Sequence, residues 1–216
     1  MNLQELAWDE TILERMDRVF SPAVTVRIRA TDAEGHTGQF QKTFFVYPDP
    51  DMVAGYPFEL GSSGESSPIL ADLDDDGVDE VVIADASGRV HALDGVGQEI
   101  AGWPVITGPN PQFHMDQAAY VDGDVPLLHE GMIATVAVGD LDGDGSPEVV
   151  GATGNGSVYA WHADGTAVAG FPVSIVGRTP DEFDTQHVYD NGIAGAPALY
   201  DLDGDGTTEI IAAAMD

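Results

Sequence analysis

The feature that most constrains the fold is an internal repeat of two short motifs at fixed spacing. An acidic motif reads "DLDDDG" at 72–77 and "DLDGDG" at 140–145 and 201–206. A marker of glycine, an aromatic residue and proline reads "GYPF" at 55–58, "GWPV" at 102–105 and "GFPV" at 170–173. From Asp72 to Gly102 is 30 residues, and from Asp140 to Gly170 is also 30. Self-similarity of this kind indicates one structural unit used several times.

The reverse stretch, from each marker to the next acidic motif, varies in length. It spans 17 residues before the first acidic motif, 38 before the second and 31 before the third. Repeat proteins place such insertions in loops on a common face. We therefore expect two insertions, at 105–131 and 174–192, in long loops where binding residues concentrate.

Within each unit the pattern is that of short strands. "SPILADL" leads into an acidic motif, the β-branched "EVVIADA" follows it, and "GRVHALDG" and "GSVYAWHADG" alternate apolar and polar residues between turn signals. The marker makes a fourth segment, where proline suits an edge strand. Nothing from residue 49 onward shows a good helical period. Four-stranded units predict an all-β chain with a partial β-propeller at 55–216, two full blades plus parts of others. A β-sandwich is the alternative, although it needs no internal repeat.

Three smaller expectations follow from this repeat. "GYPF" precedes the first unit and predicts the last strand of a preceding blade. The marker aromatics Tyr56, Trp103 and Phe171 are interpreted as blade packing, and His91 and His162 as packed or exposed strand residues. The third unit stops after its second strand, which favours a segment of a longer protein that supplies the remaining blades.

The first 48 residues differ from the rest. "AVTVRIRATDAEGHTGQFQKTFFVYPDP" alternates well and has a turn at "DAEGHTG". It resembles the last hairpin of an immunoglobulin-like or fibronectin-like module from a bacterial exported protein. Residues 1–48 are therefore expected to be the C-terminal part of such a β-sandwich module, with a linker at 49–54.

Charge excludes several classes of partner. The net charge is −31, with 7 Lys and Arg in all, and residues 49–216 carry −29 of it. A surface that negative repels nucleic acid and anionic membranes.

No apolar run approaches the ~20 residues of a membrane span. The chain has no cysteine, which excludes disulfides and thiolate metal sites. Adaptation to high salt predicts scattered acidic residues, whereas twelve of those after residue 48 fill the same four positions of the repeat.

The acidic motif has the residues of a calcium loop. Aspartates at positions 1, 3 and 5 alternate toward one centre, the glycine at position 6 permits a sharp turn, and a glutamate follows at position 9. A hard dication with six to eight oxygen ligands fits this set, Mg²⁺ fits less well and soft metals fit poorly. An EF-hand is excluded, because position 12 is not glutamate and a strand-like run follows. We predict about three Ca²⁺ ions. The expected ligands, with the carbonyl oxygen at position 7, are Asp72, Asp74, Asp76, Val78, Glu80, Asp140, Asp142, Asp144, Ser146, Glu148, Asp201, Asp203, Asp205, Thr207 and Glu209.

These units resemble the FG-GAP (or VCBS-type) repeats of integrin α-subunit propellers and many bacterial surface proteins. The resemblance covers roughly 52–216, and "GAPALYDLDGDGTTEII" contains the literal "GAP" at 195–197. It implies that calcium lies in the hairpin between the first two strands of each blade and is structural. Members of the family mostly mediate protein or carbohydrate contacts. In integrins, position 9 is usually aspartate, where this chain has glutamate.

Two functions remain open from the sequence. The first is a calcium-binding propeller segment that serves as a protein- or carbohydrate-binding or adhesion module of a larger exported bacterial protein, for instance one appended to a secreted hydrolase such as a peptidase. Its location would be extracellular or at the cell surface. The expected partner-binding residues in the two insertions are Phe113, His114, Asp116, Tyr120, His129, Phe183, Asp184, His187 and Tyr189. The alternative is part of a calcium-dependent propeller enzyme such as a polysaccharide lyase. Only Arg89 and Arg178 are available for an acidic sugar after residue 48, which favours the binding module over the enzyme.

Overall fold

The computed structural model describes residues 23–45, 53–174 and 192–214. The chain divides into two compact units, Met1–Met52 and Val53–Asp216. The described residues of both units form antiparallel sheets, which confirms the all-β prediction. Within the described ranges, no helix is long and apolar enough to cross a membrane.

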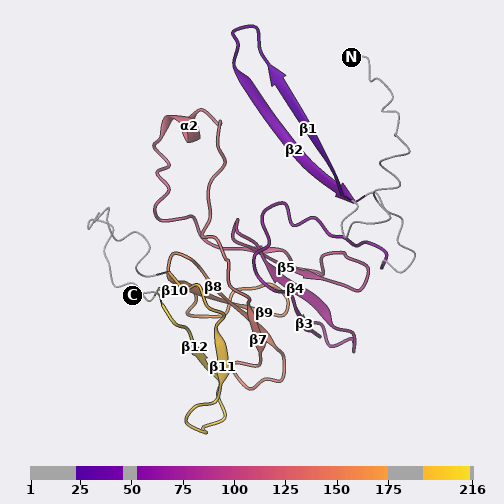
Figure 1. The fold of residues 1–216 in the computed structure, drawn as a ribbon. Coiled ribbons are helices and arrows are strands. Elements are labelled where there is room, and N and C mark those ends of the chain that lie inside the picture. The colour runs from indigo at the N-terminus through magenta and orange to yellow at the C-terminus, as the bar shows by residue number, and fades with distance from the viewer. Residues whose placement is uncertain (1–22, 46–52, 175–191, 215–216) are drawn as a thin grey trace. The chain divides into compact units, whose positions relative to one another are not determined.

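The described part of the first unit is one long hairpin (Figure 1). Strands β1 (Ala23–Thr31) and β2 (Thr37–Phe45) pair antiparallel over their whole length. Asp32 closes the turn, because its Oδ1 accepts hydrogen bonds from the backbone N–H groups of Glu34 and His36, both at 2.9 Å. The turn expected at "DAEGHTG" is confirmed, and the assignment of residues 1–48 to an immunoglobulin-like module stays a prediction.

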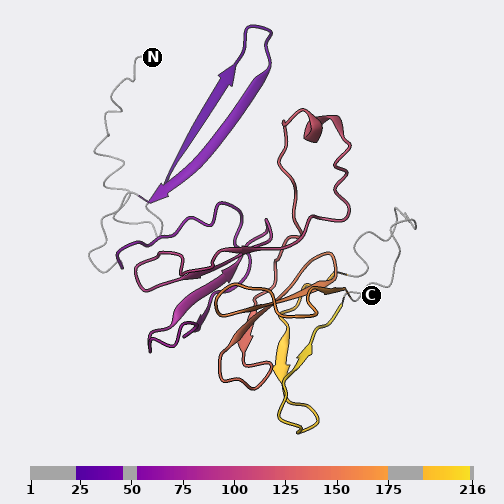
Figure 2. The same cartoon turned by 180° about the vertical axis from the view of Figure 1, so that it is seen from behind.

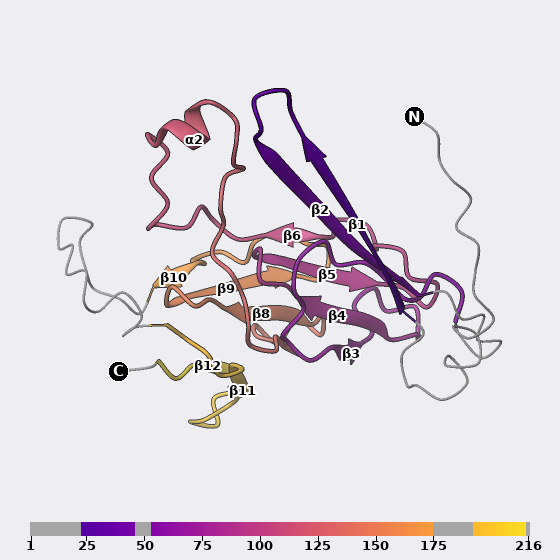
Figure 3. The same cartoon turned by 45° about the horizontal axis from the view of Figure 1, so that its top comes forward.

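The described part of the second unit contains three sheets, which Figures 1 and 2 show from opposite sides. The first sheet has the strands β3 (Ile69–Ala71), β4 (Glu80–Ala84), β5 (Arg89–Leu93) and β6 (Val105–Ile106). The second has β7 (Ala137–Gly139), β8 (Glu148–Ala152), β9 (Ser157–His162) and β10 (Val173–Ser174). The third pairs β11 (Ala198–Tyr200) with β12 (Glu209–Ile211). Strand order follows chain order in each sheet, as Figure 3 shows for the first one. Two repeated four-stranded units are therefore present where the sequence predicts them, and the arrangement is that of a partial propeller.

The hydrophobic core lies between neighbouring sheets. Neighbouring valines on β8 pack on opposite faces of its sheet. Val149 belongs to a cluster with Val82 and Val90 of the first sheet. Val150 packs with Ile193 and with partly buried residues of the third sheet. Successive side chains of a strand point to opposite faces. All five residues of β8 are consequently buried. The second sheet is therefore covered on both faces, as expected for a propeller blade with a neighbouring blade on each side.

The marker residues join one sheet to the next. Trp103 is 6% exposed, and its indole N–H donates to the carbonyl oxygen of Ala163, in the turn after β9, at 2.8 Å. Tyr56 makes the matching contact with the first sheet, since its hydroxyl donates to the carbonyl oxygen of Asp94 at 3.2 Å. Phe171 packs against the second core cluster. The prediction that these aromatics are blade packing is confirmed.

One local expectation needs correction. Residues 53–59 form turns and irregular backbone, so the strand expected at "GYPF" is not formed, although its glycine and tyrosine occupy the marker's place against the first sheet. The marker strands β6 and β10 have only two residues each. Proline lacks the N–H that a longer ladder needs. The peptide bond before each marker proline is cis.

The first insertion leaves the sheets through a short ladder. The backbone N–H of Asn110 donates to Leu128 O at 2.9 Å, and that of Glu130 donates to Gly108 O at 3.1 Å. Beyond this base the chain extends away from the sheets and carries the one-turn helix α2 (Ala118–Val121), as Figure 1 shows. The second insertion, at 175–191, lies outside the described residues.

Candidate metal centres

Each acidic motif occupies the hairpin between the first two strands of its sheet. We call these hairpins loop 1 (72–80), loop 2 (140–148) and loop 3 (201–209). The glutamate at position 9 is the first residue of the second strand and pairs with the residue before position 1, as in the pair Gly139 and Glu148. The strand register therefore fixes the loop length, and the aspartates all fall between the two strands.

The aspartate at position 1 organises the turn. In loop 2, Asp140 Oδ1 accepts from the N–H of Gly143 at 2.7 Å, and Oδ2 accepts from the N–H of Gly145 at 2.9 Å. Asp72 and Asp201 accept equivalent bonds from the glycine at position 6, at 2.9 and 3.0 Å. Gathering backbone N–H groups on a carboxylate curls the chain around it.

The glycine at position 6 has a positive φ in all three loops, from 87 to 93°. This confirms the reason for which the sequence singled it out, because only glycine adopts that conformation without strain. Position 4 also has a positive φ, of 79° at Gly143 and 77° at Gly204, and loop 1 places Asp75 there at 58°. The sequence gives less sign of this second left-handed position, because loop 1 has aspartate there in place of glycine.

The glutamate at position 9 closes the loop from its far side. Its Oε2 accepts from the backbone N–H at position 2, at 2.8 Å from Leu73, 2.8 Å from Leu141 and 2.7 Å from Leu202. Glu80 and Glu148 are 2% and 1% exposed. Since a buried carboxylate must be hydrogen-bonded or paired, this contact holds the side chain over the loop.

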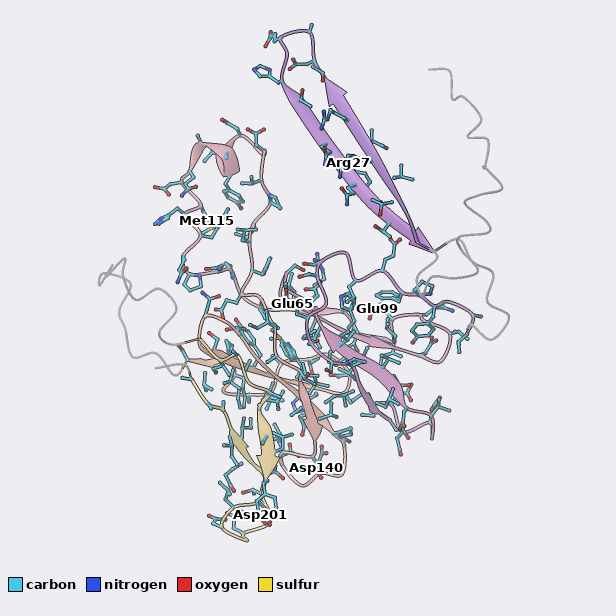
Figure 4. All side chains as sticks on the ribbon, in the orientation of Figure 1. Arg27, Glu65, Glu99, Met115, Asp140 and Asp201 are labelled. Carbon is cyan, nitrogen blue, oxygen red and sulfur yellow. The ribbon has the colours of Figure 1, made fainter. Side chains whose placement is uncertain are left out.

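The carboxylates of positions 1, 3 and 9 converge in every loop. One oxygen from each lies within 4.8 Å of the other two, and these groups are Asp72, Asp74 and Glu80; Asp140, Asp142 and Glu148; Asp201, Asp203 and Glu209. Figure 4 labels Asp140 and Asp201, which lie at the same end of their sheets. Three of the four acidic positions that the sequence predicts as ligands are thus brought together.

The aspartate at position 5 is outside these groups. Its Oδ1 accepts from the backbone N–H at position 7, at 2.7 Å in loops 1 and 2 and 2.8 Å in loop 3. Asp76, Asp144 and Asp205 therefore shape the turn with one oxygen. Their role as ligands, with that of the carbonyl oxygens of Val78, Ser146 and Thr207, stays a prediction.

The pKa values of two loop carboxylates are shifted in opposite directions. The pKa of Glu80 is raised, first by burial and then by the charges of Asp74, Asp76 and Asp72. The pKa of Asp205 is lowered by hydrogen bonds from the Thr207 hydroxyl and N–H. A buried carboxylate beside three others is costly to ionise, and a bound cation offsets that cost.

The donor set fits a hard dication. All three converging groups are carboxylates, with no nitrogen or sulfur among them. Ca²⁺ takes six to eight oxygens in flexible geometry, whereas Mg²⁺ demands a near-ideal octahedron and keeps several waters. A donor set made of carboxylates alone therefore fits Ca²⁺ better than Mg²⁺.

The candidate binding residues of the first insertion do not gather into one site. Phe113 and Tyr120 pack edge to face, with ring centroids 5.3 Å apart, and both are half-buried. His129 Nδ1 lies 2.6 Å from the carbonyl oxygen of Thr107, at the base of the insertion. His114 and Asp116 are exposed near the tip. The four candidates of the second insertion, Phe183, Asp184, His187 and Tyr189, lie outside the described residues.

Two clusters of polar side chains in the structure are not predicted by the sequence pattern. His91 is buried; its Nδ1 lies 2.5 Å from Glu99 Oε1, and its Nε2 lies 3.7 Å from Asp85 Oδ2. His162, by contrast, is partly exposed and contacts Glu148 Oε1 at 3.0 Å. Both histidines are strand residues, as expected, but their carboxylate partners come from neighbouring strands and turns that a sequence pattern does not align.

The second cluster is Asp32, Glu34 and His36, in the hairpin turn of the first unit. One ligand atom from each lies within 4.8 Å of the others, and all three side chains are exposed. The pKa of Asp32 is lowered, chiefly by its hydrogen bonds with His36. The sequence marked this segment as a turn and gave no sign that the three side chains meet.

Comparison with known proteins supports the repeat assignment. Residues 140–212, which run from loop 2 through loop 3 to the residue after β12, match the family model described as FG-GAP-like repeat. No curated protein matches the chain. The match spans the same strand–loop–strand pattern that recurs at loop 1, and it supports the assignment of residues 140–212 as FG-GAP-type repeats.

Proposed function

We propose that the three loops each bind one Ca²⁺ ion and that these ions stabilise a propeller segment serving as a binding or adhesion module. The observation that carries this proposal is the convergence of the same three carboxylates, within 4.8 Å, in three loops. The same oxygen-only donor set in three separate loops favours a common ligand over chance clustering of surface acids.

The place of each ion in the fold supports a structural role. All the candidate ligands of an ion come from one hairpin of nine residues, and in loops 1 and 2 the glutamate at position 9 is buried and begins a largely buried strand. An ion held this way ties the turn to the second strand of its blade. It does not join two elements that move apart, so we assign the ions to stability and not to signalling.

The partner-binding part of the proposal concerns the first insertion. Backbone hydrogen bonds hold its base, and the insertion exposes the side chains of Met115, Val121 and Leu128, at 56, 68 and 51%. Exposed apolar side chains on a rigidly anchored loop are typical of recognition surfaces. We propose that the insertions bind a protein or polysaccharide. FG-GAP-type repeats are typical of extracellular proteins, which supports an exported protein.

Calcium titration by calorimetry tests the metal assignment. We expect about three sites in the unaltered protein, and one fewer in each of the variants Asp74→Asn, Asp142→Asn and Asp203→Asn. Asp116→Asn, an exposed aspartate of the insertion, serves as the control and should keep all sites. Stoichiometry that ignores the loop variants, or Mg²⁺ binding as tight as Ca²⁺ binding, would contradict the proposal.

Partner binding requires a separate experiment. Residues 111–127 can be replaced by Asn-Gly, a two-residue turn that joins antiparallel chains. Surface plasmon resonance would compare this variant with the unaltered protein on collagen, starch, cellulose and chitin. We expect the ligand that binds the unaltered protein in Ca²⁺ to lose binding to the variant, while the number of calcium sites stays the same. Equal binding by both proteins would exclude the first insertion.

A further inference from the structure

We propose that loops 2 and 3 bind their ions cooperatively, through a backbone hydrogen bond that loops 1 and 2 lack. This inference rests on the proposed calcium binding and adds a coupling between two of the three sites.

The link joins the two loops next to candidate ligands. The backbone N–H of Thr208 donates to the carbonyl oxygen of Leu141 at 3.4 Å. The N–H of Leu141 donates in turn to Oε2 of Glu148, the position 9 ligand of loop 2, at 2.8 Å. Thr208 directly precedes Glu209, the position 9 ligand of loop 3. Leu141 is thus held on one side by a ligand of its own loop and on the other by the neighbouring loop.

Further contacts keep the two loops adjacent. A Cβ placed on Gly143 of loop 2 would lie 3.9 Å from the carbonyl oxygen of Gly206 in loop 3. Just before the loops, a Cβ on Gly139 would lie 3.2 Å from the Leu199 side chain. Figure 4 shows Asp140 and Asp201 next to each other at this end of the sheets. Ordering of either loop therefore limits the positions open to the other.

Loop 1 and loop 2 lack the equivalent link for a reason visible in the sequence. Position 8, which is Thr208 in loop 3, is Pro147 in loop 2. Proline has no backbone N–H and cannot donate to the preceding loop. Both loops are described in full, and no backbone hydrogen bond joins them. Among neighbouring loops in the described residues, loops 2 and 3 are therefore linked by a backbone hydrogen bond and loops 1 and 2 are not.

The sign of the coupling follows from the ordering cost. An ion in loop 3 fixes Glu209 and the adjoining N–H of Thr208, which holds the Leu141 peptide and so helps to orient Glu148. A second ion then binds to a loop that is already partly ordered and pays less conformational entropy. Coupling of this kind is reciprocal, so an ion in loop 2 must favour loop 3 by the same factor.

The test compares the affinity of loop 2 for Ca²⁺ in two single-loop variants. We expect Asp203→Asn, which disables loop 3, to weaken binding at loop 2 by about fivefold or more, within the usual range of coupling energies. Asp74→Asn, which disables loop 1, should leave loop 2 unchanged. Calorimetry gives the affinities, and hydrogen exchange at the Leu141 amide reports on loop 2 separately. Equal effects of the two variants would overturn the inference.

Position 8 offers a matched pair of substitutions. Thr208→Pro introduces the residue that loop 2 already carries there and should abolish the dependence of loop 2 on loop 3. Thr208→Ala keeps the N–H and should preserve that dependence. Coupling that survives Thr208→Pro would overturn the inference. Loops that bind Ca²⁺ independently contradict this inference alone, whereas failure of every loop to bind Ca²⁺ contradicts the proposed function as well.

Discussion

Single residues at the blade junctions explain why the marker begins with glycine. A Cβ on Gly102 would lie 1.9 Å from the carbonyl oxygen of Asp164, and one on Gly55 would lie 1.7 Å from that of Val96. Both carbonyls belong to the turn after the third strand of the following sheet. The φ angles of 92 and 85° also favour glycine. The turn of one blade therefore packs directly on the backbone of the marker before it.

Substitution of Gly102 by alanine should destabilise the second unit strongly. The left-handed φ costs about 1–2 kcal/mol, and the overlap with the Asp164 carbonyl adds enough to exceed about 3 kcal/mol in total. Gly170→Ala is the control, because its φ is 94° but no described atom lies within 4 Å of the added Cβ. We expect a loss of about 1 kcal/mol there. Urea unfolding measures both, and equal losses would contradict the assigned packing.

At position 4 of loop 1, a substitution to glycine should stabilise the protein. Asp75 has a φ of 58°, at the place where the other loops have glycine. Asp75→Gly should relieve about 1 kcal/mol of left-handed strain and lose about half of that to the greater freedom of the unfolded chain. A net gain of about 0.5 kcal/mol in the free energy of unfolding is expected without calcium, where removing a carboxylate also reduces repulsion. A destabilised Asp75→Gly variant would contradict this account of the loop.

At the scale of strands and loops, the sequence predicts those features that depend on motif spacing and on alternation along the chain. The acidic hairpins, the four-stranded order and the packing of Trp103 and Phe171 all follow from repeat spacing and alternation, and the structure has them. The sequence could not predict that the backbone N–H of Leu73 donates a hydrogen bond to Glu80, because this contact depends on the strand register. Likewise, Asp85, His91 and Glu99 meet only after two strands and a turn are paired.

The Trp103 side chain is one of the contacts that join the first two sheets. Trp103→Phe should lower the free energy of unfolding by about 1–3 kcal/mol, because it removes ring contacts and leaves the Ala163 carbonyl oxygen without its donor. Trp161→Phe is a suitable control, since this residue is similarly buried, at 5%, and stacks on Tyr159. Thermal unfolding should show the larger loss for Trp103→Phe. A larger loss for Trp161→Phe would show that ring packing outweighs the hydrogen bond at the junction.

At the scale of the whole molecule, charge is the dominant feature. The chain carries a net −31, and three loops concentrate carboxylates that converge within 4.8 Å. Composition alone leaves two explanations, adaptation to salt and specific cation binding. The repeated geometry favours the second, because a salt-adapted surface has no need for the same three carboxylates to meet in every loop. The two explanations differ in how the protein responds to individual ions at constant ionic strength.

The most direct test is thermal unfolding in EDTA, followed by addition of Ca²⁺ or Mg²⁺ at matched ionic strength. Without calcium, four carboxylates in each loop repel one another, and the Tm should be low. Saturation with Ca²⁺ at about 100 times its Kd adds about 2.7 kcal/mol for each site. We predict that Ca²⁺ raises the Tm by many degrees and that Mg²⁺ does so much less. Equal Tm values in EDTA, Ca²⁺ and Mg²⁺ would contradict the account and leave the loops as solvated acidic turns.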